Sequence, residues 1–415
     1  MNEGYREISF CEVCGNTGLV SVLDLGRHPM CDDLVPVGDG RECKEYPIEI
    51  LFCRECNTAH QRFQVPKEEL FPATYHYRSR FTADVLNGMA GLVESCALRV
   101  GSLSGMTVLD VGCNDGSLLD FFKQKGAVTL GIEPTGASVD ARSKGHTTYS
   151  DYLSESLAEK IVASHGQPNF ITFTNVFAHI EDLQGVLRSL KILMAENTTV
   201  VIENHYLGSV LEGNQFDTFY HEHPRTYSYS SFARMARTLG IRLAAVEFPS
   251  RYGGNIRVIL SNRKIGPADG EVSLESLNRR ESGFFDKFTS LRRNIENWRV
   301  AKSRFLEAQI QKLGPLRAKA FPGRAAILVK LLGLNESMVS AVYEKPGSLK
   351  IGHYLPGTRI PICSDTDLFA LSDQAMPILN LAWHIPDEIR QYLTAGGYAG
   401  PIIDILSADD FLPSH

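Results

Sequence analysis

The stretch VLDVGCNDGSLL, Val108–Leu119, decides the fold. It reads as an apolar strand that ends in Asp110, a tight turn, and an amphipathic helix that continues to Gly126. Gly112 and Gly116 allow the backbone of the turn to adopt conformations that other residues resist. The stretch contains neither GxGxxG nor GxxxxGK[ST]. Without that lysine, or glycines at those spacings, it is not expected to cradle a pyrophosphate.

Three further apolar segments follow this strand and read as strands between helices. They are VTLGIEP (128–134), NFITFTNVFAHI (169–180) and NTTVVIENHYL (197–207). Strands that alternate with helices indicate an α/β fold, with a parallel sheet covered by helices on both faces. Right-handed crossovers would place the carboxyl ends of the strands, and therefore a ligand, along one edge of the sheet.

A second alternation of strands and helices begins late in the chain. Residues 271–313 are charged and helically periodic, and AAILVKLL, from Ala325, opens a further α/β region. We therefore predict three parts: an N-terminal module over 1–66 that contains two CxxC pairs, a central core over 67–270, and a helical linker with a smaller Rossmann-like lobe over 271–415.

Composition limits the classes of function. The chain has 415 residues, of which 43% are hydrophobic and 22% charged, and its net charge is −6, so nothing marks a nucleic-acid surface. It has no apolar run of about 18 residues, as a membrane span requires. Its N-terminus lacks a signal-peptide pattern. We expect a cytoplasmic monomer whose thiols are reduced.

Four cysteines form two CxxC pairs about 40 residues apart, which is a strong zinc signal. The two-residue gap lets both sulfurs of a pair reach one tetrahedral ion, and four thiolates leave no open position for catalysis. The predicted structural zinc ligands are Cys11, Cys14, Cys53 and Cys56. The alternatives are two chance CxxC pairs or a redox pair.

The D-x-G-x-x-x-G form of the first motif resembles motif I of class I S-adenosylmethionine (SAM)-dependent methyltransferases. The resemblance implies that the turn accommodates the amino-acid end of SAM. It also implies that Glu133, at the end of the second strand, holds both ribose hydroxyls, a task that suits a carboxylate. The alternative is an ordinary strand-turn-helix without a ligand. The cofactor residues assigned in this way are Asp110, Gly112, Asn114, Gly116, Glu133 and Asn175.

The order of three features resembles the nucleotide-sugar C-methyltransferases over essentially the full length. These are the cysteine module, the SAM core, and FDTFYHEH (216–223) soon after the ENHYL strand. YGGNIRV (252–258) and HYLPGTRIPI (353–362) also match. The resemblance implies methylation at C-3 of a dTDP- or other nucleotide-linked 4-keto hexose. It assigns catalysis to His223, Glu222, Tyr220 and His179, and places the sugar near Tyr75 and Tyr77.

The chain departs from this family pattern at three places. Tyr252-Gly-Gly-Asn255 stands where HGGS is usual, and KAFPGRAAI carries Arg324 in place of a lysine. Pro224 and Arg225 stand where the family is often apolar or aromatic.

Methyl transfer to carbon needs a base, because a saturated C–H is not nucleophilic and a neighbouring ketone must acidify the proton. Histidine is the natural base near neutral pH, so we assign proton abstraction to His223. Glu222 would orient the sugar, Tyr220 would donate a hydrogen bond toward the keto oxygen, and His179 would line the pocket.

Other interpretations of these residues stay open. The HxH pattern could hold a metal or form a structural cluster, and His179 and both tyrosines could be packing residues. Arg257 could bind phosphate or pair with a carboxylate. The remaining substrate candidates are Asn255, Lys330 and Arg359. Two other functions compete with C-methylation: N- or O-methylation of a sugar or other small acceptor, and a zinc-ribbon scaffold with a decayed methyltransferase core.

Overall fold

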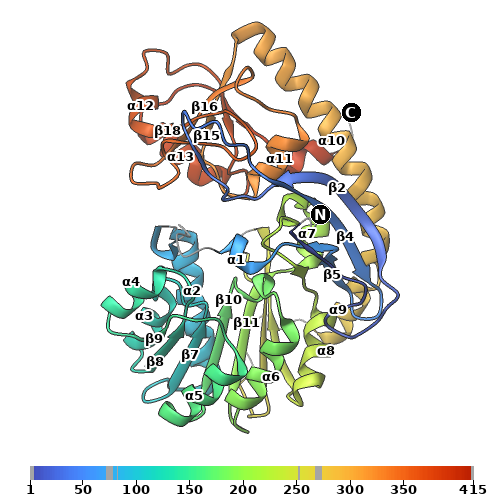
Figure 1. Cartoon of the computed structure of the whole chain (residues 1–415), viewed down its shortest axis with the longest axis vertical. Helices are drawn as coiled ribbons and strands as arrows, with labels where there is room; N and C mark the ends of the chain where they lie inside the picture. The colour runs from blue at the N-terminus through green and yellow to red at the C-terminus, as the bar shows by residue number, and fades with distance from the viewer. Residues whose placement is uncertain (1–3, 72–77, 82, 251–252, 267–272, 413–415) are drawn as a thin grey trace. The chain divides into compact units, whose positions relative to one another are not determined.

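The computed structural model describes residues 4–71, 78–81, 83–250, 253–266 and 273–412 (Figure 1). The chain falls into two compact units. The first unit comprises Met1–Ser21, Leu51–Val210 and Glu222–Phe285, and the second comprises Val22–Ile50, Leu211–His221 and Asp286–His415. The predicted boundaries at 66 and 270 stay a prediction.

A seven-stranded sheet forms the centre of the first unit, in the order β13-β14-β11-β10-β7-β8-β9 (Figure 1). The pairs that link β11, β10, β7, β8 and β9 are parallel, whereas β14 is antiparallel to both of its neighbours. The strands are β7 Thr107–Val111, β8 Val128–Ile132, β9 Thr147–Tyr149, β10 Phe170–Thr174, β11 Thr199–His205, β13 Leu243–Glu247 and β14 Asn255–Ser261.

Helices connect these strands. α2 and α3 pack on one face, where Leu92, Phe122 and Phe170 belong to one buried cluster. Polar caps set several ends: Ser228 closes a capping box on α8, and Gly240 ends that helix in a left-handed conformation. The helices are α2 Ala83–Val100, α3 Ser117–Gln124, α4 Ala137–Ser143, α5 Glu155–His165, α6 Leu183–Leu193, α7 Leu207–Glu212, α8 Tyr229–Leu239 and α9 Leu274–Glu281.

Short strands around the cysteines complete the first unit. β1 (Arg6–Glu7) pairs with β6 (Phe63–Gln64), and β5 (Thr58–Gln61) pairs with β12 (Arg225–Thr226), both antiparallel. The helix α1 (Lys67–Leu70) follows. The 3₁₀ helices η1 and η2 cover Ser79–Phe81 and Phe177–His179.

The second unit contains a five-stranded parallel sheet in the order β18-β16-β15-β19-β20. The chain moves outward from β15 to β18 and then returns to the other side of β15, so its topological switch point lies between β15 and β19. The strands are β15 Leu316–Lys319, β16 Val339–Glu344, β18 Ile362–Ser364, β19 Ile378–Asn380 and β20 Ile402–Asp404. The helices are α10 Phe284–Leu313, α11 Ala325–Leu331, α12 Asp365–Ala370 and α13 Pro386–Ala395, with η3 Phe216–Thr218 and η5 Ala408–Phe411.

Residues between the cysteine pairs add extended structure to the second unit. β2 (Val20–Pro29) and β4 (Glu45–Cys53) are neighbours in one sheet, and β3 (Val35–Pro36) pairs antiparallel with β17 (His353–Tyr354). The predicted α/β class and the predicted C-terminal α/β lobe are therefore confirmed.

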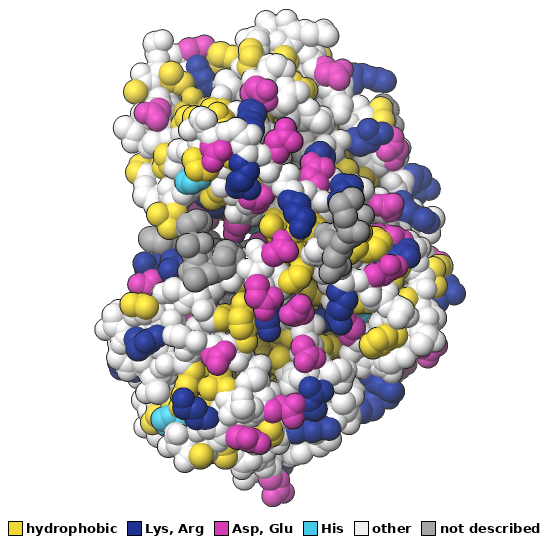
Figure 2. Space-filling model, in the orientation of Figure 1, with side chains coloured by type: hydrophobic (Ala, Val, Ile, Leu, Met, Phe, Trp, Pro, Cys, Tyr) yellow, Lys and Arg dark blue, Asp and Glu magenta, His cyan; other side chains and the backbone are white. Residues whose placement is uncertain are grey.

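The charge distribution on the surface and the character of the helices agree with the composition of the chain. On the face shown in Figure 2, positive and negative side chains are interspersed among the coloured residues rather than gathered by sign. Across the described part of the chain, no helix combines the length and the apolar character needed to cross a membrane.

Candidate active site

The four predicted zinc ligands come together in the first unit. Their sulfur atoms all lie within 4.8 Å of one another. The Sγ atoms of Cys11 and Cys56 are 3.5 Å apart, and so are those of Cys14 and Cys53. Tetrahedral zinc with bonds of about 2.3 Å would separate its sulfurs by roughly 3.8 Å. The residues present therefore fit a closed, structural zinc site.

The motif turn after β7 adopts the strained backbone that its glycines suggested. Gly112 and Gly116 have φ of 75° and 76°, and Asn114 has φ of 49°. A Cβ atom on Gly112 would lie 2.4 Å from Cγ2 of Val176. The turn therefore lies directly against the loop that follows β10, and a side chain at Gly112 would separate the two.

Two acidic residues lie at the carboxyl ends of neighbouring strands. Glu133 follows β8, is buried, and accepts hydrogen bonds from the backbone N–H groups of Asn114 (2.9 Å) and Thr135 (2.8 Å). These donors fix both carboxylate oxygens, each of which has further acceptor capacity. Asp110 is also buried and accepts a bond from Thr172 Oγ1 at 2.7 Å. Burial and the nearby charge of Glu133 raise the pKa of Asp110 to about 7.

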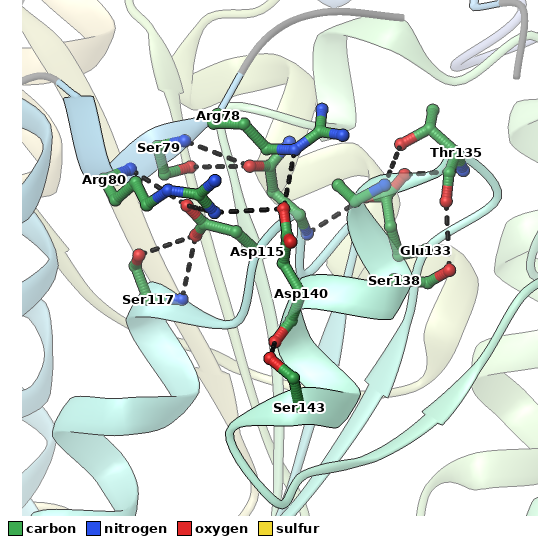
Figure 3. A network of polar contacts seen from close by, with 12 residues as sticks. Arg78, Ser79, Arg80, Asp115, Ser117, Glu133, Thr135, Ser138, Asp140 and Ser143 are labelled. Carbon is green, nitrogen blue, oxygen red and sulfur yellow. Dashed lines mark hydrogen bonds and ion pairs between the residues drawn. The ribbon is translucent and has the colours of Figure 1, made fainter. Parts of the chain in front are cut away.

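A segment that the sequence analysis did not assign binds to the same turn (Figure 3). The backbone N–H of Ser79 donates to Asn114 Oδ1 at 3.0 Å, and that of Arg80 donates to Asp115 Oδ2 at 3.1 Å. Asp140, on α4, accepts hydrogen bonds from the guanidinium groups of Arg80 (3.0 Å) and Arg78 (2.9 Å). The side chain of Asn114 therefore holds this segment, while its backbone N–H holds Glu133.

Three histidines gather at the carboxyl ends of β10 and β11. The ring of His223 lies 4.8 Å from that of His179 and 5.6 Å from that of His205, measured between centroids. His179 Nδ1 is 2.7 Å from the carbonyl oxygen of Glu222. Burial lowers the pKa of His179 to about 4, so its ring is neutral at pH 7. The Phe71 ring packs against His179 at 5.3 Å.

The other histidine of the YHEH motif belongs to the second unit. His221 Nε2 lies 3.1 Å from the carbonyl oxygen of Tyr46, and the two rings are 5.9 Å apart. Burial lowers the pKa of His221 to about 4. In the described part of the chain, the groups that could hold a metal do not include this motif, which disfavours the metal interpretation of HxH.

The candidates near β14 form a buried polar network. Asn255 Nδ2 donates to Glu203 Oε1 (3.1 Å) and to Asn175 Oδ1 (3.3 Å). Arg257 donates to Glu203 and to Glu247, at 2.7 Å each. Of the two interpretations left open for Arg257, the structure favours pairing with carboxylates.

The remaining substrate candidates also have partners or lie elsewhere. In the second unit, Lys330 Nζ lies 2.5 Å from Glu45 Oε1. Arg359 donates to backbone carbonyl groups of residues 39–41. Tyr220 is half-buried in the second unit. Tyr75 and Tyr77 lie outside the described residues.

Sequence reasoning missed two further groups. The first group is Glu203 and His205, which are two residues apart on β11 and therefore share one face of the sheet. The sequence Glu-Asn-His at the end of a strand could have indicated this pair. Asp217, in the second unit, is fully buried and accepts hydrogen bonds from Arg324 (2.7 and 2.8 Å) and from Trp383 Nε1 (2.8 Å). No local pattern in the sequence indicates that second contact.

Three family models match consecutive parts of the chain. They are described as "Putative zinc binding domain" (residues 11–71), "Methyltransferase domain" (76–246) and "C-methyltransferase C-terminal domain" (250–400). The first contains the cysteine cluster, and the second contains the motif turn and the histidines.

Among curated relatives, C-methyltransferase NovU of Streptomyces niveus is 28% identical over 413 residues, which cover 97% of this chain and 93% of NovU. The ubiquinone biosynthesis O-methyltransferase of Escherichia coli is 34% identical over 98 residues, which cover 22% of this chain and 40% of that protein.

Solved structures overlap part of the chain at low scores. The PH0226 protein from Pyrococcus horikoshii OT3 is 12% identical, covers 48% of this chain and 98% of its own, and gives a TM-score of 0.37. The magnesium protoporphyrin IX methyltransferase from Synechocystis with bound SAM is 14% identical, with 42% and 77% covered and a TM-score of 0.31.

The sheet order, the motif turn and the consecutive domain matches lead to one assignment. The chain is a SAM-dependent C-methyltransferase with a structural zinc site, and it is similar to NovU over nearly its whole length.

Proposed function

We propose that this enzyme transfers a methyl group to C-3 of a nucleotide-linked 4-keto deoxysugar, as a step in branched-sugar synthesis. Methylation at carbon requires a carbon nucleophile, and a ketone beside the reacting carbon acidifies the C–H bond that must be broken. The C-methyltransferase assignment therefore supports a keto substrate on chemical grounds. The sugar and its nucleotide come from the resemblance carried by YHEH (220–223), YGGNIRV (252–258) and HYLPGTRIPI (353–362).

The observation that carries the proposal is the split of the two motif histidines. His223 lies with His179 and His205 at the strand edge that bears the motif turn, whereas His221 is bound to a backbone carbonyl in the second unit. A base must reach its proton within about 3 Å, which requires a place in the pocket. This geometry supports His223 as the residue that takes the C-3 proton.

The neighbours of His223 suggest their own roles. His179 is neutral at pH 7 and tied to the Glu222 carbonyl, so it can hold the sugar without adding a second positive charge. Tyr220 is assigned to the keto oxygen, where a phenol donor would stabilise the developing enolate charge. When bound, SAM supplies the electrophilic methyl group. Asp110, Gly112, Asn114, Gly116, Glu133 and Asn175 shape and line its site.

The nucleotide is assigned to the C-terminal lobe. Ligands of open parallel sheets bind at the carboxyl edge near the topological switch point, here between β15 and β19. Because Lys330 and Arg359 already have partners in the second unit, each would have to exchange its present contact for phosphate.

The proposal includes the domain boundaries predicted from sequence, a cytoplasmic location and a monomeric state.

The test is incubation of the zinc-loaded enzyme with SAM and a panel of dTDP- and GDP-linked 4-keto sugars. We expect a gain of one methyl group by mass spectrometry for one of them. Without SAM, the same sugar should exchange deuterium at C-3, because proton abstraction precedes methyl transfer. A methylated oxygen or nitrogen, with no exchange at C-3, would replace this proposal with O- or N-methylation.

A further inference from the structure

One side chain ties the zinc module to both proposed catalytic histidines. Arg225 is fully buried and stands two residues after His223. Its Nη1 contacts the Glu12 carboxylate, its Nη2 contacts the carbonyl oxygen of Ile180, and its Nε donates to the Tyr227 hydroxyl at 2.9 Å. Because a planar guanidinium offers donors in fixed directions, these contacts fix the orientation of the group.

Glu12 connects this guanidinium to the zinc ligands. It lies between Cys11 and Cys14 in the first CxxC pair and is itself buried. Its carboxylate also accepts a bond from Gln64 Nε2 at 2.9 Å, and its backbone carbonyl accepts one from Gln184 Nε2 at 2.7 Å. A movement of the CxxC turn would therefore be passed directly to the Arg225 side chain.

Backbone hydrogen bonds also connect the zinc module to the segment that follows His223. β5 pairs with β12 so that Arg225 lies opposite His60, and the Gln61 N–H donates to the Pro224 carbonyl at 2.8 Å. His60 Nε2 in turn lies 3.3 Å from Cys11 Sγ. The strand that holds the chain immediately after His223 thus also touches a zinc-binding sulfur.

The loop that carries His179 is held by the same side chain. Ile180, whose carbonyl accepts from Arg225, directly follows His179, and His179 Nδ1 is bound to the Glu222 carbonyl. Arg225 therefore contacts the loop that carries His179 and lies in the segment that directly follows His223. Its contact with Glu12 joins both to the CxxC turn.

We propose that the Glu12–Arg225 pair is a positioning device that fixes the imidazoles of His179 and His223 relative to each other, with the zinc module as its anchor. Zinc would then support the rate of methyl transfer as well as the stability of the fold. The inference rests on the proposed roles of the two histidines. The competing interpretation is a buried ion pair that affects folding alone.

The two interpretations differ in what happens to protein that remains folded and zinc-loaded. Misplacement of a reacting group by about 1 Å costs about 100-fold in rate. We therefore expect Glu12→Gln and Arg225→Met to lower kcat roughly 100-fold, while KM for the sugar and the affinity for S-adenosylhomocysteine change less than about 3-fold. Zinc should stay at one ion per chain by elemental analysis.

Arg225→Lys and Arg62→Met serve as the conservative variant and the matched control. Lysine keeps a positive charge for Glu12 but loses the forked contacts to Ile180 and Tyr227. The kcat of Arg225→Lys should therefore be roughly 10-fold below that of the wild type. Arg62 is paired with Glu7 in the same module, where both side chains are partly exposed. Arg62→Met should match the wild type in every measurement.

A second measurement does not depend on the substrate. The imidazole NMR resonances of His179 and His223, assigned with His179→Asn and His223→Asn, should shift in Glu12→Gln and in Arg225→Lys but not in Arg62→Met. Wild-type resonances and a kcat within about 2-fold in zinc-loaded Glu12→Gln would overturn the inference. If that variant does not fold, Arg225→Lys decides by the same criteria.

This design separates two failures. If the wild-type enzyme methylates none of the keto sugars, the proposed function is lost, yet the resonances still show whether Glu12 and Arg225 position the two rings.

Discussion

At the carboxyl edge of the first sheet, Asp110 and Glu133 accept hydrogen bonds from neutral donors, whereas the second sheet pairs Asp365 with an ammonium group. Lys319 Nζ lies 2.8 and 2.7 Å from the two oxygens of Asp365, and both side chains are almost fully buried. In both sheets the strands next to these carboxylates pair in parallel, so strand direction does not explain the difference. A carboxylate bound only by neutral donors still has acceptor capacity for a ligand, whereas the charge of one paired with a cation is compensated within the fold.

The two histidines of the motif extend this comparison and give the largest expected effect. His223→Asn should lower kcat about 10²–10⁴-fold, because a general base contributes that much, while calorimetric binding of S-adenosylhomocysteine is retained. His221→Asn should lose only the hydrogen bond to the Tyr46 carbonyl and keep most of the activity. A large loss in the His221 variant, with none in the His223 variant, would move the base to the second unit.

The carboxylates themselves can be compared by stability. Asp365→Asn leaves the Lys319 ammonium buried without its counter-charge and should lower the free energy of unfolding by about 3–5 kcal/mol. Asp110→Asn should cost less than about 1 kcal/mol, because burial already raises the pKa of Asp110 and its ionised form is poorly solvated. Denaturant unfolding of both variants at pH 7 measures the difference. Similar losses would show that Asp110 is as structural as Asp365.

Cofactor binding should depend on one of two similarly placed glutamates. Glu133 and Glu344 each follow or end a strand and accept a backbone N–H, Glu344 from Phe321 at 2.6 Å. Glu133→Gln removes a charged acceptor from the proposed ribose site and should weaken S-adenosylhomocysteine binding roughly 10- to 100-fold. Glu344→Gln, in the second unit, should bind as the wild type does. Equal affinities in both variants would remove Glu133 from the ribose site.

Local spacing was enough to predict part of this site. The positive φ at Gly112, the acidic strand end at Glu133 and the approach of the two sulfurs within each CxxC loop follow from residues close in sequence. Each is a short-range property, because a turn, a strand end or a CxxC loop is set by its own residues. The meeting of the two cysteine pairs was predicted instead from the four ligands that structural zinc requires.

Contacts over long separations could not be read in this way. Arg225 meets Glu12 across most of the first unit's sequence, and the backbone of Ser79 meets Asn114. The partner of Arg257 was likewise open, because an arginine on an apolar strand fits either a phosphate or a carboxylate until the facing strand is known. Only the register of β11 against β14, which places Glu203 opposite Arg257, decides it.

Acid should destabilise the two units to a similar, smaller extent, through a buried neutral histidine in each. Burial lowers the pKa of His179 to about 4 and, with the charge of Arg324, that of His384 to about 3. Below an ordinary pKa of about 6.5 the unfolded chain takes up a proton that each folded site refuses, so stability is fully present above that pH and is lost as pH falls toward 4 and 3.

At pH 5.5 each histidine should therefore cost about 1.4 kcal/mol of stability relative to pH 7.5. His179→Asn and His384→Asn should each reduce the difference in unfolding free energy between pH 7.5 and pH 5.5 by that amount, measured by denaturant unfolding, since asparagine does not titrate. The effect should be the same in both units, because desolvation is the main cause at both sites. An unchanged slope in one variant would mean that its imidazole is solvated and charged in the folded protein, and for His179 it would weaken the neutral role proposed beside His223.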